Sequence, residues 1–213
     1  MSENTYGPAD PQPSFSAAGL DEWVGHVEAV LRGIAHALNN RASAISAVIE
    51  LSRDPGEEDV TRSILTTELD RVLELSNVVR SIGMPRSGGS EAFAPRDVAP
   101  EALAALQLHA EQRDRVIMIE ANAAPPTRVP RWMFLRAMIA LAATSASPDD
   151  RSRSVRLTAV EEGEWLMVRS VDGGARRSVY AGELAIAMGG APVEDECAFR
   201  VPTLAALRQR EGL

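Results

Sequence analysis

The chain has 213 residues, of which 45% are apolar and only 4% aromatic, and its formal net charge is −8 at pH 7. This length suits one large domain or two small ones, and the aliphatic bias favours packed helices. The negative charge argues against a nucleic-acid partner held through its phosphates. Because no apolar run is long enough to span a bilayer and no signal peptide is recognisable, we expect a cytoplasmic protein without a membrane partner.

The first part of the chain predicts a tail followed by two long helices. Residues 1–18 are rich in Pro, Ser, Ala and Gly, which is typical of a flexible tail. Residues 19–84 predict amphipathic helices over about 20–52 and 57–82, separated by Asp54-Pro55-Gly56, and therefore an antiparallel hairpin. The predicted apolar stripes comprise Val24, Val27, Leu31, Ile34, Leu38, Ile45 and Val48 on the first helix, and Leu65, Leu69, Val72 and Val79 on the second.

A single hairpin cannot bury both of these stripes by itself. We therefore expect two copies of the chain to pair into a homodimeric four-helix bundle. The composition of residues 85–92 indicates a linker to a second domain at 93–213.

The second domain alternates between helical and strand patterns. Their order predicts a small α/β sandwich, with helices on one face of a largely antiparallel sheet, so the whole chain is assigned to the α+β class. The predicted helices cover 99–113, 131–145, 181–188 and the residues from Thr203 onward; the predicted strands cover 116–120, 154–160, 165–171 and 198–201.

The most informative stretch lies on the first predicted helix and centres on His36. If Ile34 and Leu38 face the hairpin interior, the His36 side chain points outward, and Arg32 and Asn40, four residues before and after it, lie on the same side. A neutral imidazole is a nucleophile near physiological pH, and an outward one can be reached by a second protein. Arg32 could then pair with phosphoryl oxygens, and Asn40 could donate a hydrogen bond or orient a water.

The same spacing also fits a surface histidine without a chemical role, with Arg32 and Arg41 as solvated charges. His26 and His109 are both expected to be surface residues, and their separation in sequence gives no metal-binding spacing. Cys197 is the single cysteine, so no internal disulfide can form.

The segment from residue 31 to 40, Leu-Arg-Gly-Ile-Ala-His-Ala-Leu-Asn-Asn, resembles the H-box helix of sensor histidine kinases, most closely the nitrogen-regulator type. The resemblance continues through Ala44-Ile45 and Glu50-Leu51. It implies that His36 is the phosphorylated residue and that 19–84 is a dimerisation and phosphotransfer domain. Residues 165–174 are similar to the strand and Asp-x-Gly box of the kinase ATPase domain, and 185–190 and 199–202 to elements near that domain's end.

Three departures from the kinase pattern argue against phosphorylation from ATP. Ala37 stands where the kinases have an acidic residue, residues 135–145 lack the asparagine that binds magnesium, and only eight residues separate Gly174 from Glu183, which leaves no room for an ATP lid. A histidine hairpin with such a degenerate ATPase domain resembles the ChpT-like histidine phosphotransferases and the sporulation phosphotransferase.

This resemblance implies phosphoryl relay between His36 and the aspartate of a response-regulator receiver domain in two-component signalling. The receiver would contact Arg32, Arg41 and Ser43 and would supply Mg²⁺, so the chain needs no cofactor or metal of its own. An upstream hybrid histidine kinase is a further partner compatible with this role.

Three alternatives stay open. A catalytically silent pseudokinase that binds and regulates a receiver is favoured by Ala37. A phosphatase would use Asn40 to orient water, and an active ATP-dependent kinase ranks last.

Overall fold

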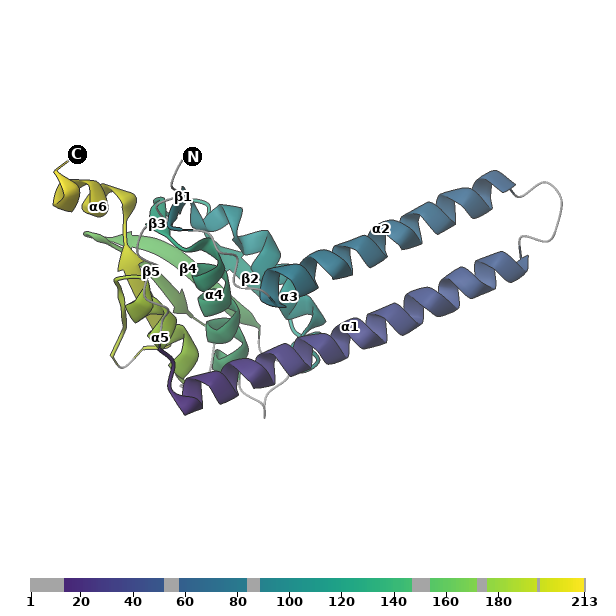
Figure 1. Cartoon of the computed structure of the whole chain (residues 1–213), viewed down its shortest axis with the longest axis horizontal. Coiled ribbons are helices and arrows are strands. Elements are labelled where there is room, and N and C mark those ends of the chain that lie inside the picture. The colour runs from purple at the N-terminus through teal and green to yellow at the C-terminus, as the bar shows by residue number, and fades with distance from the viewer. Residues whose placement is uncertain are drawn as a thin grey trace, which may run out of the picture.

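The computed structural model describes residues 14–51, 58–83, 89–146, 154–171, 176–194 and 196–212. A long two-helix hairpin, α1 (Ala17–Leu51) and α2 (Glu58–Gly83), projects from a sheet domain built by the rest of the chain (Figure 1). This arrangement confirms the predicted α+β class with its helical hairpin and small sheet domain. Residues 1–13 of the predicted tail, Asp54-Pro55-Gly56, 85–88 of the predicted linker and the Asp172-Gly173-Gly174 box lie outside the described residues.

The main sheet has five strands in the order β2-β4-β5-β7-β6. The first pair is parallel and the other three pairs are antiparallel, as the prediction of a largely antiparallel sheet requires. The strands are β2 (Ile117–Glu120), β4 (Val155–Glu162), β5 (Trp165–Ser170), β6 (Ala191–Pro192) and β7 (Ala198–Pro202).

A second, two-stranded sheet pairs β1 (Glu91–Phe93) with β3 (Thr127–Val129). The beginning of β1 lies inside the stretch that its composition assigned to the linker. Each strand has only three residues, too few for an alternating pattern to emerge from the sequence.

Helix α4 (Arg131–Ser145) is the central element of the sheet domain and is buried along almost its whole length. Its bounds match the prediction because a long and largely apolar run, broken only by Arg136, follows Pro130 and Arg131 at the point where the helix begins. The other helices are α3 (Ala99–Leu108), α5 (Val179–Ala187) and α6 (Leu204–Glu211), with a short 3-10 turn at Pro95–Asp97. Helix α3 ends five residues earlier than predicted, because His109 takes an extended backbone conformation.

The N-terminal half of α1 packs against α3, α4 and α5, whereas the far half of the hairpin extends beyond the sheet domain (Figure 1). Trp23, Val30 and Ile34 of α1 are buried in the common core. The predicted apolar stripe of α1 is thus buried only in part. Three of its members stay exposed on the outer face of the hairpin: Val24, Leu31 and Leu38, at 52%, 45% and 40% exposure. No helix among the described residues is both long and apolar enough to cross a membrane.

Candidate functional site

His36 lies in the middle of α1, and its side chain is exposed, as are those of Arg32 and Asn40. The side-chain amide Nδ2 of Asn40 lies 3.3 Å from Nε2 of His36. One helical turn separates the two residues, so this contact follows from the helix face that the sequence predicted them to share. Imidazole and amide therefore form one polar surface on the convex side of the hairpin.

The contact with Asn40 also fixes the tautomer of the imidazole. An amide nitrogen can only donate, so His36 Nε2 must carry the lone pair, and in the neutral ring the proton sits on Nδ1. The lone pair that accepts from Asn40 is also the one that would attack phosphorus, so this hydrogen bond has to open before any transfer. Asn40 thus favours the tautomer in which Nε2 is unprotonated and covers that nitrogen until a partner arrives.

Arg41 and Ser43 differ in their availability to a partner. Nη1 of Arg41 donates to Oε2 of Glu68 on α2 at 3.2 Å, and the arginine side chain is half-buried. Glu68 is only 6% exposed, and its other oxygen accepts from Arg71 at 2.5 Å. Arg41 is thus held in an ion pair across the hairpin, whereas Ser43 is exposed.

Ala37, at the position where the resembling kinases carry an acid, is partly buried and packs against the common core. One turn before it, the backbone of Gly33 lies against the carbonyl of Leu108 at the end of α3. The Ala37 side chain is therefore directed at the sheet domain, and the His36 side chain at solvent.

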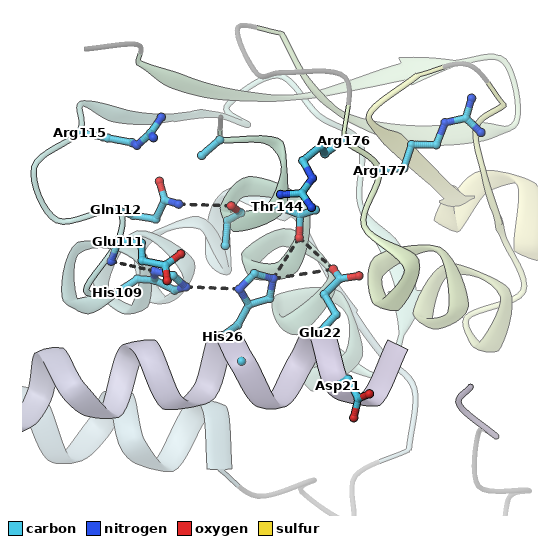
Figure 2. Close-up of a pocket in the computed structure, with 13 residues that line it drawn as sticks. Asp21, Glu22, His26, His109, Glu111, Gln112, Arg115, Thr144, Arg176 and Arg177 are labelled. Carbon is cyan, nitrogen blue, oxygen red and sulfur yellow. Dashed lines mark hydrogen bonds and ion pairs between the residues drawn. The ribbon is translucent and has the colours of Figure 1, made fainter. Parts of the chain in front are cut away.

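A second polar cluster, which the sequence did not reveal, surrounds the other two histidines. The expectation that His26 and His109 are surface residues is wrong, because His109 is 1% exposed and His26 is partly buried. Both line a cavity of about 600 Å³ between α1 and the sheet domain (Figure 2). Other residues lining it include Glu22, Gln112, Thr144 and Arg176.

One local signal for this cluster exists in the sequence. Glu22 precedes His26 by one helical turn, which is the spacing of an acid-histidine pair, and their side chains lie 3.7 Å apart. His109 carries no such signal, because its partners come from other elements. Among the described residues, no group of three or more His, Cys, Asp or Glu side chains is arranged to hold a metal ion.

No family model matches the sequence, and no curated protein matches it. Among solved structures, the chain is similar to that of the histidine kinase AdeS of Acinetobacter baumannii, with 11% identity, a TM-score of 0.42, and coverage of 79% of this chain and 98% of the solved chain. It is also similar to a histidine kinase of Burkholderia phymatum, with 14% identity, a TM-score of 0.40, and coverage of 82% and 96%.

A third similar structure is the histidine kinase ThkA in complex with the response regulator TrrA, with 12% identity, a TM-score of 0.41, and coverage of 90% of this chain and 68% of the other. A fourth is a bacterial phosphotransferase, with 13% identity, a TM-score of 0.37, and coverage of 88% and 97%. No functional assignment rests on similarities of this size.

Proposed function

We propose that the chain is a histidine phosphotransfer protein that relays a phosphoryl group between His36 and the aspartate of a response-regulator receiver domain. The observation that carries the proposal is the exposed imidazole of His36 on a convex helix, with its nucleophilic nitrogen set by Asn40. Because both side chains are exposed, a second folded protein can reach this nitrogen once the Asn40 amide turns aside.

The transfer is a displacement at phosphorus that this site can support. Nε2 of His36 forms the new bond to phosphorus as the bond to the receiver's aspartyl oxygen breaks, and the aspartate leaves as a carboxylate. The negative oxygens need cations nearby; Arg32, one turn before His36, supplies one, and Mg²⁺ bound by the receiver supplies the other. Because the imidazole becomes positively charged on attack, the proton on Nδ1 can leave to solvent at this exposed position.

The proposed acting unit is a homodimer. Exposed apolar side chains continue along both helices of the hairpin, at 45% for Leu31 and 40% for Leu38 on α1, and at 58% for Leu69 and 61% for Leu73 on α2. A second copy that packs on this face would bury them in a four-helix bundle. Leu38 follows His36 by two residues and so points about 160° away from it around the helix, which leaves the imidazole accessible in such a dimer.

Phosphotransfer from a labelled receiver tests the proposal. Receivers carrying a radioactive aspartyl phosphate are mixed with the wild-type chain, with His36→Gln and with Asn39→Gln, an exposed neighbour on α1 that serves as the matched control. We expect an acid-labile label on the wild type and on Asn39→Gln, and none on His36→Gln. A label that persists on His36→Gln, or that appears on no variant with any receiver of the same organism, would contradict the proposal.

The same assay separates the phosphatase alternative, for which the position of Asn40 is the relevant observation. In that case inorganic phosphate is released while the chain stays unlabelled, and Asn40→Ala stops the release. Under the relay proposal, Asn40→Ala keeps the label on His36 but acquires it more slowly, because the ring is no longer held in the reactive tautomer.

A further inference from the structure

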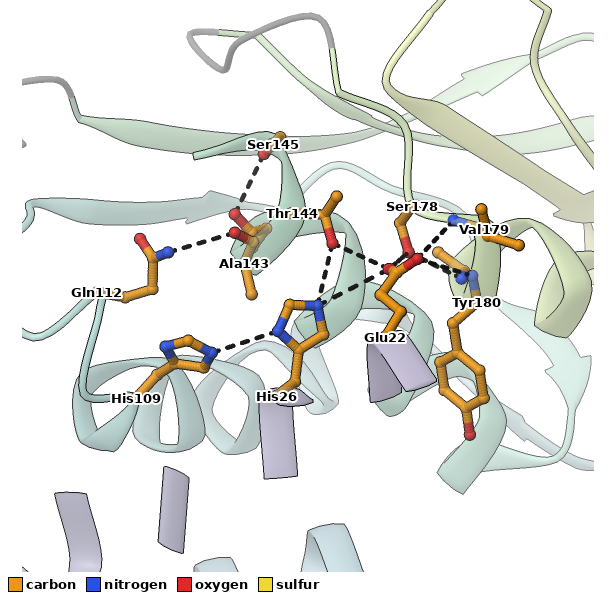
Figure 3. Close-up of polar contacts among 12 residues, drawn as sticks. Glu22, His26, His109, Gln112, Ala143, Thr144, Ser145, Ser178, Val179 and Tyr180 are labelled. Carbon is orange, nitrogen blue, oxygen red and sulfur yellow. Dashed lines mark hydrogen bonds and ion pairs between the residues drawn. The ribbon is translucent and has the colours of Figure 1, made fainter. Parts of the chain in front are cut away.

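The first turns of α1 are joined to the sheet domain by a continuous chain of hydrogen bonds (Figure 3). Glu22 of α1 lies at the N-terminus of α5, where its Oε2 accepts from the backbone N–H of Val179 at 2.8 Å and of Tyr180 at 3.4 Å. Its Oε1 accepts from the hydroxyl of Ser178. A carboxylate is well placed there because the helix N-terminus carries partial positive charge and unpaired N–H groups.

The direction of the remaining bonds follows from Glu22. The hydroxyl of Thr144 donates to Glu22 Oε1 at 2.9 Å, so its oxygen can only accept from Nε2 of His26, at 3.0 Å. His26 therefore carries its proton on Nε2, and its bare Nδ1 accepts from Nε2 of His109 at 3.3 Å. Nδ1 of His109 in turn accepts from the backbone N–H of Glu111 at 3.3 Å. All these bonds are satisfied together when both imidazoles are neutral.

An added proton breaks this chain wherever it binds. On Nδ1 of His26 it would place two donors against each other, and His109 could relieve the conflict only by moving its own proton to Nδ1. The protonated Nδ1 of His109 would then face the backbone N–H of Glu111, which is also a donor. Either the bond between the two imidazoles or the bond from Glu111 is therefore lost. Burial, together with the smaller effects of the nearby His26 and Arg32, lowers the pKa of His109 to about 4.

Other charged groups surround the pair. Glu22 faces His26 along α1, and the cavity that gives water access to His26 is also lined by Asp21, Glu111, Arg115, Arg176 and Arg177 from the neighbouring elements (Figure 2). The cavity lining thus contains both acidic and basic side chains. Glu22 lies 3.7 Å from Nε2 of His26, and His109 lies 3.3 Å from Nδ1 of the same ring, so a carboxylate and a second imidazole flank His26.

We propose that Glu22, Thr144, His26 and His109 form a pH-sensitive latch that holds the N-terminal half of α1 on the sheet domain while both imidazoles are neutral and releases it when the pair takes up a proton. The release reaches the part of α1 nearest the candidate site. The N–H of Ala110, next to His109, donates to the carbonyl of Ala29 on α1 at 3.1 Å, one turn before Gly33 packs against Leu108. Opening of the latch therefore frees the sheet domain from the helix that carries His36, and it does so whether or not His36 accepts phosphate.

Hydrogen-deuterium exchange of the full chain tests the latch at about pH 7.5 and about pH 5, with rates corrected for intrinsic exchange. We expect peptides from the N-terminal half of α1 to exchange faster at the lower pH, by up to about tenfold for each pH unit below 6.5, because a released His109 binds the proton there whereas the docked one resists it down to about pH 4. His26→Gln keeps a donor and an acceptor but does not titrate, so its exchange should respond to pH less than that of the wild type, because only His109 of the pair is left to take up a proton. His36→Gln, which removes an exposed histidine outside the latch, should respond like the wild type.

Two results would overturn the proposal: an unchanged rate in the wild type, or the same pH response in His26→Gln. Peptides from β5 must stay protected at the lower pH, because exchange there together with α1 would indicate global unfolding instead of a latch.

A second measurement applies to the wild type alone, in case His26→Gln does not fold. The chain has three histidines, so their ring ¹⁵N signals can be assigned individually. We expect His26 and His109 to be protonated on Nε2 and bare on Nδ1 at neutral pH, and an Nδ1–H tautomer in either ring would disprove the bond order of the latch.

Discussion

Gly33 of α1 lies directly against the backbone carbonyl of Leu108 at the end of α3. A Cβ atom on Gly33 would sit 1.6 Å from that carbonyl oxygen, which no neighbouring side chain can relieve by rotating. The absence of a side chain at Gly33 therefore sets how closely the hairpin and the sheet domain approach.

We predict that Gly33→Ala separates α1 from α3 and lowers the free energy of unfolding by about 1–3 kcal/mol, as overpacking typically does. Urea denaturation followed by tryptophan fluorescence measures this loss. The matched control is Gly25→Ala on the same helix, where no atom lies within 4 Å of the added Cβ. Because alanine is the better helix former, the control should gain about 0.5–1 kcal/mol, and equal effects at both positions would refute the close contact.

Arg136 of α4 anchors the base of the hairpin in a similar way. Its guanidinium lies between two indoles, 5.2 Å from the Trp23 ring centroid and 5.0 Å from that of Trp132, and it donates to the carbonyl of Ile82 at 2.9 Å. The residue is 8% exposed, so water screens these contacts little. Arg136 thus joins α1, α2 and α4.

Replacement of Arg136 by methionine should destabilise the chain by about 2–4 kcal/mol, because it removes two cation-π contacts and the hydrogen bonds that the buried guanidinium makes to the Ile82 carbonyl and the Tyr180 side chain. Thermal and urea unfolding both measure the change. Arg128→Met serves as the control, because Arg128 is half-exposed and its ion pair with Glu211 spans 3.7 Å. Such a surface pair is worth about 0–1 kcal/mol, so a control as unstable as Arg136→Met would show that the effect is not specific.

Several elements were predictable from the sequence because their signal is local. Helix α4 follows a proline and consists of a long apolar run, and the contact between His36 and Asn40 needs only the geometry of one helical turn. Strands β1, β3 and β6 have two or three residues each, which is too short for a periodic pattern.

The contacts that sequence reasoning missed join residues far apart in the chain. Arg41 meets Glu68 only in the register that the folded hairpin adopts, and Glu22 meets Ser178 across 156 residues. Burial of His109 depends on the early end of α3, which turns the side chain inward. Residue type and spacing do not encode these contacts, so the latch is visible only in the tertiary structure.

The exposed apolar face of the hairpin predicts that association depends on Leu31. Leu31→Glu places a charge on an exposed apolar position of α1 that the second copy would cover, where the carboxylate would have to lose its hydration, so we expect the variant to be monomeric. Light scattering after size-exclusion chromatography should give twice the 22.9 kDa chain mass for the wild type and the single mass for the variant. Val116→Glu is the control, since Val116 is 64% exposed but lies in the sheet domain. A monomeric wild type, or a dimeric Leu31→Glu, would refute the proposed bundle.

Burial of His109 predicts how the stability of the whole chain depends on pH. Its pKa is lowered from 6.5 to about 4 in the folded state, first by burial and then by the charges of His26 and Arg32. Between these two values the unfolded chain binds the proton and the folded chain does not, so acidification favours unfolding. The contribution of His109 is complete above pH 6.5, falls as the pH drops toward about 4, and amounts to about 3 kcal/mol over the full range.

Urea denaturation at a series of pH values measures this dependence, and the difference between the wild type and His109→Gln isolates the part due to His109. Glu22 contributes a slope of the same sign: burial raises its pKa, but hydrogen bonds from His26, Ser178, Thr144 and the Tyr180 backbone together lower it. That slope is present in both proteins and cancels in the difference. His109→Gln should start from a lower stability and lose less of it between pH 6.5 and 4, whereas His36→Gln should follow the wild type. Parallel curves for the wild type and His109→Gln would mean that His109 is protonated in the folded chain and is not buried as described.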